Sequence, residues 1–129
     1  MIILLDTSTP VCKLTLVLDG VWHDYEWTSG RELARGLHAY LRDRLAEHGK
    51  HLEDITGIGA MKGPGSFTGL RIGLTVLNTI ADTLQVPIVG VEMSDDWRVS
   101  AVGLLEKGEN HTLVLPFYGR EANITKPRK

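Results

Sequence analysis

The chain has little of several features that would restrict its function directly. It contains one cysteine, Cys12, among 129 residues, so it forms no internal disulfide, as is usual in a reducing cytoplasm. Its 14 basic residues against 16 acidic ones give a net charge of -2, which provides no overall field to attract nucleic acid. No apolar run approaches the roughly 20 residues that span a bilayer, and the start lacks signal-peptide features. We expect a cytoplasmic protein without membrane contact.

Patterns typical of catalysis and metal binding are also sparse. No histidine lies near Cys12 in the sequence, and Ser66 has no general base nearby. The histidines show none of the spacings that are typical of metal ligands; they are His23, His38, His48, His51 and His111. We therefore expect no catalytic residue, no metal and no cofactor.

Hydrophobic periodicity divides the chain into short strand-like and helix-like segments. Residues alternate between apolar and polar on both sides of Asp19-Gly20, and this dipeptide is a strong hairpin signal. Leucines at three- and four-residue steps after Gly30 predict an amphipathic helix. We expect strands over residues 2–6, 11–18, 21–28, 55–62, 86–91 and 113–117, and helices over residues 30–48, 66–84 and 95–107.

The helix ends carry recognisable signals. Ser29 and Glu32 have the spacing of a capping box before the first helix, and Gly49 is placed to end that helix. Ser66 and Ser94 are natural N-caps for the second and third helices.

The order of these elements predicts the fold class. Three strands in a meander, followed by alternating helices and strands, give a mixed sheet with helices on its faces, because right-handed crossovers make the later pairings parallel. This is a ribonuclease H-like α/β fold, which also forms half of the actin and chaperone ATPase fold. We expect one domain over residues 1–118 and a polar, mobile tail over residues 119–129.

A glycine-rich turn joins the fourth strand to the second helix. Glycines before a helix N-terminus often hold phosphate, but no Gly-Lys-Ser/Thr sequence begins this helix, so the turn does not match a Walker loop. Close packing is the interpretation we favour, with Gly69 and Gly73 leaving room for a partner helix. Gly36 within the first helix either marks a close approach by another group or is merely tolerated there. The turn itself consists of Lys62, Gly63, Pro64, Gly65 and Ser66.

Asp6, at the end of the first strand, leaves an enzymatic alternative open. A ribonuclease H-like nuclease needs several carboxylates around two Mg²⁺ ions, yet the fourth strand ends in Lys62 and Gly63. An actin-type phosphate loop needs a glycine, which the segment from Asp6 to Pro10 lacks. The alternative is therefore a nucleotide-binding or nuclease-type enzyme that uses Asp6.

The apolar surface of the second helix exceeds what one neighbour can cover. Phe67, Leu70 and Leu74 belong to one apolar stripe, and Ile72 and Val76 belong to another. Two stripes need two neighbours. One is the sheet, and the other is either the preceding helix or a separate subunit, which favours a protein partner.

Three segments resemble the TsaB (YeaZ) family, whose members are accessory subunits for tRNA threonylcarbamoyladenosine synthesis. They are Leu5 to Thr9, the block from Lys62 to Gly73, and Pro87 to Val91. The resemblance spans residues 1–91, which correspond to the family's N-terminal domain. It implies a non-catalytic scaffold that binds the transferase TsaD, forms a homodimer when alone and contacts tRNA only through the complex.

The resemblance also implies where the partner binds. Two helices make the contacts in the family, and both are present in this sequence. The corresponding residues are Leu33, Gly36, Leu37 and Tyr40 in the first helix, and Gly69, Leu70, Gly73, Leu74 and Leu77 in the second.

The chain departs from the family pattern after the fifth strand. Residues 92–110 stand where the family carries a second domain, and residues 116–120 then resemble the Pro-x-Tyr-x-Arg at the family's C-terminus. We expect a minimal form without that domain, which leaves recruitment of the ATPase TsaE open. The tail ends in Lys126, Arg128 and Lys129, and contact between these residues and tRNA is likewise open.

Overall fold

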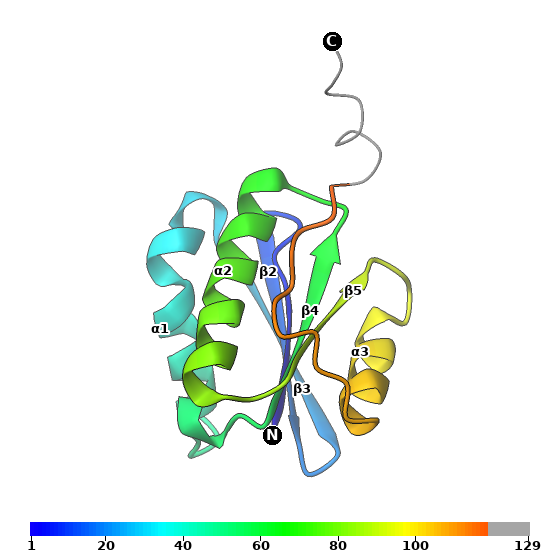
Figure 1. Cartoon of the computed structure of the whole chain (residues 1–129). Coiled ribbons are helices and arrows are strands. Elements are labelled where there is room, and N and C mark those ends of the chain that lie inside the picture. The colour runs from blue at the N-terminus through cyan, green and yellow to red at the C-terminus, as the bar shows by residue number, and fades with distance from the viewer. Residues whose placement is uncertain (119–129) are drawn as a thin grey trace.

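A computed structural model describes residues 1–118, and its centre is a five-stranded mixed sheet (Figure 1). The strand order is β3-β2-β1-β4-β5. β1 pairs antiparallel with β2, and β2 pairs antiparallel with β3, whereas β1–β4 and β4–β5 are parallel. This topology confirms the predicted ribonuclease H-like α/β fold. The strands are β1 (Ile2–Asp6), β2 (Val11–Leu18), β3 (Val21–Thr28), β4 (Gly57–Gly63) and β5 (Ile88–Glu92).

Three helices cover the two faces of the sheet. α1 (Leu33–Ala46) and α2 (Phe67–Leu84) lie side by side on one face, and α3 (Trp97–Glu106) lies on the other (Figure 1). Ile3 and Leu5 pack toward α1 and α2, whereas Leu4 packs toward α3, because successive strand residues point to opposite faces. Two single-turn 3-10 helices complete the elements, at Gly30–Glu32 and Leu52–Asp54. None of the helices described is long and apolar enough to span a membrane.

Two predicted helix starts are wrong, and in each case the serine hydroxyl bonds elsewhere. The capping box at Ser29 does not form: Ser29 has helical dihedral angles, φ -79° and ψ -36°, where an N-cap residue is normally extended, and its Oγ donates to the carbonyl of Pro10 at 3.2 Å. The Glu32 carboxylate instead forms an ion pair with Arg35, in which Glu32 Oε1 lies 3.7 Å from Arg35 Nη1. Ser94 Oγ donates to the Asp96 carboxylate at 3.0 Å, and α3 begins only at Trp97.

The predicted strand over residues 113–117 does not form. Residues 110–118, here called the strap, run between α2 and β5 (orange in Figure 1). The side chain of Asn78 on α2 makes the pair of backbone hydrogen bonds that a neighbouring strand would make. It donates to Val114 O and accepts from Val114 N, each at 2.9 Å. Farther along, Phe117 N donates to Lys62 O at 2.7 Å. The strap thus pairs with one amide side chain and isolated carbonyls, where a sheet strand would have a continuous backbone partner. The expected tail over residues 119–129 lies outside the described residues.

Replacing Asn78 by alanine tests how firmly the strap is held. The substitution leaves the N–H and carbonyl of the buried Val114 without partners, which should lower the free energy of unfolding by about 1–2 kcal/mol. Urea denaturation measures this change. Thr79→Ala is the matched control, since the exposed Thr79 hydroxyl bonds only within its own helix, to Thr75 O. Equal effects of the two substitutions would show that Asn78 does not hold the strap.

Candidate protein-docking surface

The glycine-rich turn is enclosed by the chain's own segments. Ser66 caps α2 as predicted, with its Oγ accepting from Gly69 N at 3.2 Å. Gly63 has a φ of +124°, and a Cβ there would meet the carbonyl oxygen of Phe117 in the strap. A Cβ on Gly65 would meet Ser8 in the turn after β1. The turn therefore packs between the β1–β2 connection and the strap.

The room beside Gly69 and Gly73 is taken by Thr7. A Cβ on Gly69 would meet the carbonyl oxygen of Thr7, and a Cβ on Gly73 would meet its hydroxyl. Thr7 Oγ1 also donates to Gly69 O at 2.7 Å. The prediction that these glycines clear a path for a partner helix is therefore wrong. Gly36 marks a close approach, one of the two alternatives left open by the sequence, and the approaching group is the Trp27 ring, which a Cβ on Gly36 would meet at 2.9 Å.

The carboxylate of Asp6 is engaged within its own turn. One of its oxygens accepts from Ser8 N at 2.8 Å and from Ser8 Oγ at 2.6 Å, and the residue is buried. Burial, and secondarily the Asp6 charge, raise the pKa of the Cys12 thiol to about 12, so this thiol is protonated at neutral pH. Among residues 1–118, no three His, Cys, Asp or Glu side chains converge as metal ligands. The enzymatic alternative at Asp6 stays a hypothesis.

Most of the predicted partner-binding residues belong to the chain's own core. Gly36 and Tyr40 are partly exposed, and Tyr40 stacks on Trp27 with ring centroids 4.8 Å apart. The predicted residues therefore lie where α1 and α2 come together. Their contact with a partner protein stays a prediction. The buried ones are Leu33, Leu37, Gly69, Leu70, Gly73, Leu74 and Leu77.

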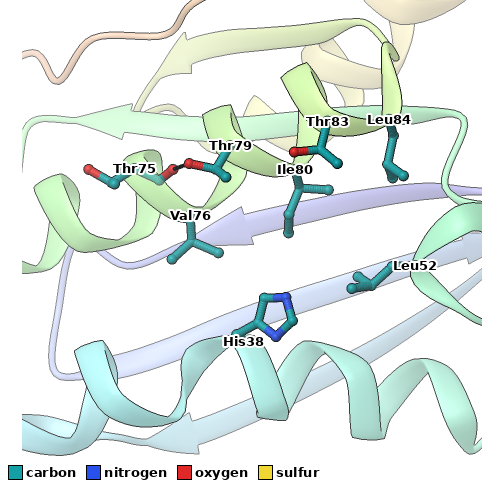
Figure 2. Close-up of a pocket in the computed structure, with 8 residues that line it drawn as sticks. All are labelled: His38, Leu52, Thr75, Val76, Thr79, Ile80, Thr83 and Leu84. Carbon is teal, nitrogen blue, oxygen red and sulfur yellow. Dashed lines mark hydrogen bonds between the residues drawn. The ribbon is translucent and has the colours of Figure 1, made fainter.

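A groove lies between α1 and α2, and most of the side chains that line it are accessible (Figure 2). His38 faces it from α1, while threonines and aliphatic residues face it from α2. Its volume of about 250 Å³ is below the roughly 300–1,000 Å³ of small-molecule sites. The lining, which we call the α1–α2 groove, consists of His38, Leu52, Thr75, Val76, Thr79, Ile80, Thr83 and Leu84.

Sequence reasoning placed Val76 in the second apolar stripe but assigned partner contact to other positions, and it missed the threonines and His38 of the groove. A usable signal was present, however: threonine recurs on one side of α2, at Thr68, Thr75 and Thr79, and all three are exposed. The groove continues past Ala34 and Ile72 toward the start of α2. The groove lining in Figure 2 holds no Asp, Glu, Lys or Arg, and Arg71 is the one charged residue that lines the extension, which suits a packed helix better than a small polar ligand.

Comparison with known proteins gives consistent relatives. The family model described as "TsaD: tRNA N6-adenosine threonylcarbamoyltransferase" matches residues 28–124. The tRNA threonylcarbamoyladenosine biosynthesis protein TsaB of Escherichia coli K12 is 33% identical over 90 residues, which are 70% of this chain and 39% of that protein. TsaB of Haemophilus influenzae is 32% identical over 92 residues, and the match covers 67% of this chain and 37% of that protein. The chain spans about two-fifths of the length of these curated relatives.

A solved structure leads to the same family. YeaZ from Pseudomonas aeruginosa superposes with a TM-score of 0.63 at 34% identity, covering 70% of this chain and 44% of its own. A second structure from that organism, described as similar to the peptidase YEAZ, has a TM-score of 0.66 at 35% identity, covering 70% and 42%. Together with the family model, these matches show that the chain belongs to the TsaB (YeaZ) family, within the group that the TsaD model describes.

Proposed function

We propose that this chain is a non-catalytic subunit for tRNA threonylcarbamoyladenosine synthesis, which binds a TsaD-like transferase through the α1–α2 groove. The observation that carries the proposal is the groove itself, an accessible and nearly uncharged furrow on a member of the TsaB family. In this role the chain supports the transferase and meets tRNA only as part of the complex.

The fold of the expected partner supports this docking mode. A TsaD-named relative, the tRNA N6-adenosine threonylcarbamoyltransferase of Syntrophus aciditrophicus, is 35% identical over 63 residues, 49% of this chain and 18% of that protein. A partner with a related fold carries its own pair of helices on the corresponding face. Two such pairs packed face to face make a four-helix arrangement with a shared apolar centre. Recruitment of a TsaE-like ATPase would then depend on surfaces of the whole complex.

The hydrogen bonds that the Asp6 carboxylate accepts support the non-catalytic part of the proposal. Both hydrogen bonds to its Oδ1 come from Ser8, so this oxygen is committed to shaping the turn after β1. Thr7, which lies between Asp6 and Ser8, packs against α2. The turn that would be a phosphate loop in an actin-type ATPase thus serves the internal packing of the domain.

Placing two arginines in the groove tests the docking mode. Thr75 and Thr79 are exposed on α2, so Thr75→Arg with Thr79→Arg should leave the fold intact. Two charges buried without partners at a helix interface should weaken binding of the TsaD-like transferase from the same source at least tenfold. Isothermal titration calorimetry measures the affinity.

Ser100→Arg is the matched control for that experiment. Ser100 is exposed on α3, on the opposite face of the sheet, and its substitution should not change transferase affinity. Transferase binding that survives the double substitution, or that is lost equally with Ser100→Arg, contradicts docking through the groove. Thermal melting of each variant separates these outcomes from unfolding.

A further inference from the structure

A second cavity, here called the α3 pocket, lies between the start of α3 and the part of the sheet formed by β1, β2 and β3. Its volume of about 310 Å³ lies within the roughly 300–1,000 Å³ of small-molecule sites. Charged side chains of both signs line it, beside apolar ones from the start of α3. The charged lining includes Asp6, Lys13, Glu26 and Arg98, and the apolar lining includes Met93 and Trp97.

The Asp6 carboxylate has one oxygen free for a ligand in this pocket. Asp6 is only 6% exposed, and both hydrogen bonds from Ser8 go to Oδ1, so Oδ2 accepts none from residues 1–118. Oδ2 is not sealed in the core, because Arg44 Nε is the only fully enclosed side-chain nitrogen or oxygen without a partner in that range. A buried carboxylate oxygen that opens into a cavity is a strong acceptor for an ammonium group.

Two cationic side chains of the pocket also keep donors without a partner among residues 1–118. The strand register pairs Lys13 with both Asp6 and Glu26, yet Lys13 makes no ion pair in this range. Arg98 uses only Nη1, which donates to one side chain of β2 and one of β3, each at 2.8 Å. The Lys13 ammonium and the other Arg98 nitrogens can therefore donate to a carboxylate.

We propose that the α3 pocket binds a small zwitterion, an α-amino acid with an aliphatic side chain. Its ammonium group donates to Asp6 Oδ2, its carboxylate accepts from Lys13 and Arg98, and its side chain packs against Met93 and Trp97. This inference goes beyond the proposed function and does not depend on it, because α3 and the α1–α2 groove lie on opposite faces of the sheet.

The strand register gives the charges a spacing that suits this ligand. Asp6 and Lys13 are directly opposite on β1 and β2, and such residues have Cβ atoms about 4.5–5.5 Å apart. An α-amino acid carries its ammonium and carboxylate groups on one carbon, so it needs two partners that lie close together. A ligand with a single charge would meet a group of its own sign at this spacing. Glu26, the other neighbour of Lys13, is exposed, so water screens its charge.

Titration with L-leucine and its two singly charged analogues tests the site. 3-Methylbutylamine lacks the carboxylate of leucine, and 4-methylpentanoate lacks the ammonium group. In NMR spectra of the full chain, leucine at millimolar concentrations should shift the backbone amide signals of Lys13, Met93 and Trp97. Each analogue should bind at least tenfold more weakly, because one of the two charge-assisted contacts is lost.

Two substitutions remove the two charged contacts separately. Asp6→Asn keeps an oxygen that accepts from Ser8 and replaces only Oδ2, by an NH₂ group that cannot accept from ammonium, so leucine affinity should fall at least tenfold. Lys13→Met keeps the length of the side chain without its charge; it should weaken leucine binding but not binding of 3-methylbutylamine. The matched controls are Asp82→Asn and Lys107→Met, both at exposed positions outside the pocket, and neither should change leucine affinity.

Three results would overturn the proposal: no amide shifts with leucine at millimolar concentrations, an analogue that binds as tightly as leucine, or unchanged leucine affinity of Asp6→Asn. The spectrum of each variant without ligand reports whether its fold is retained. If Asp6→Asn unfolds, Lys13→Met and the two analogues still decide the result on folded protein. Transferase binding is measured separately, so loss of the groove contact leaves the leucine result standing, and the reverse also holds.

Discussion

Gly73→Ala should lower the free energy of unfolding by about 2–3 kcal/mol, although alanine is the better helix former by about 1 kcal/mol. The added methyl would meet the Thr7 hydroxyl, with Thr7 Cγ2 and Cβ at 2.9 and 3.0 Å. Thr7 cannot retreat freely, because its hydroxyl donates to Gly69 O at 2.7 Å. Urea denaturation measures the loss.

A double-mutant cycle assigns that loss to the contact between the two residues. Thr7→Ala removes the obstructing atoms together with one hydrogen bond, so alone it should cost about 1 kcal/mol. Combined with Gly73→Ala, it should cost less than the sum of the two changes, with a coupling of about 1–2 kcal/mol. Gly103→Ala is the control, since a Cβ there meets nothing within 4 Å; it should be neutral or stabilising. Additive losses would contradict the packing of Thr7 against Gly73.

The strands and the sheet topology could be predicted from the sequence because their signals are local and repeated. Asp19-Gly20 marks the turn between β2 and β3, and the apolar run of β1 marks that strand. The predicted bounds of β1, β2 and β3 match the structure. The parallel pairings then follow from connection length and handedness.

The wrong start of the first helix and the missing strand both involve groups far away in the sequence, whereas Ser94 bonds to Asp96, two residues along. Ser29 has the spacing of a cap, but the register that pairs Val11 with Thr28 brings the Pro10 carbonyl to its hydroxyl. The strap alternates like a strand, but its neighbour is Asn78 on a helix. Local patterns contain no information about which distant groups will hold a side chain or a backbone segment.

The proposed docking surface was the hardest part to predict, because apolar periodicity does not say what a stripe packs against. α1 and α2 must first bury their leucines on the sheet, and only then is the remaining surface available to another chain. What remains on α2 is largely threonine, which a search for apolar residues passes over. The space beside the glycines that suggested a partner helix is filled by Thr7, which lies 62 residues before Gly69.

Leu37→Ala should lower the free energy of unfolding by about 2–5 kcal/mol without weakening transferase binding by the chains that remain folded. The Leu37 side chain is fully buried, within the core cluster that joins α1 to the sheet. Truncation therefore leaves a cavity in the core, while the groove lining in Figure 2 keeps its composition. Denaturation gives the stability, and calorimetry at low temperature, where the variant is folded, gives the affinity.

His38→Ala is the complementary substitution one residue along the same helix. His38 is exposed and faces the groove, so its truncation should change stability by less than about 0.5 kcal/mol. The same change removes contact area at the proposed interface and should weaken transferase binding several-fold. Opposite responses to these neighbouring substitutions separate residues that build α1 from residues that meet the partner. If Leu37→Ala weakens binding while stability is unchanged, the leucine contacts the partner directly and α1 must rotate when the complex forms.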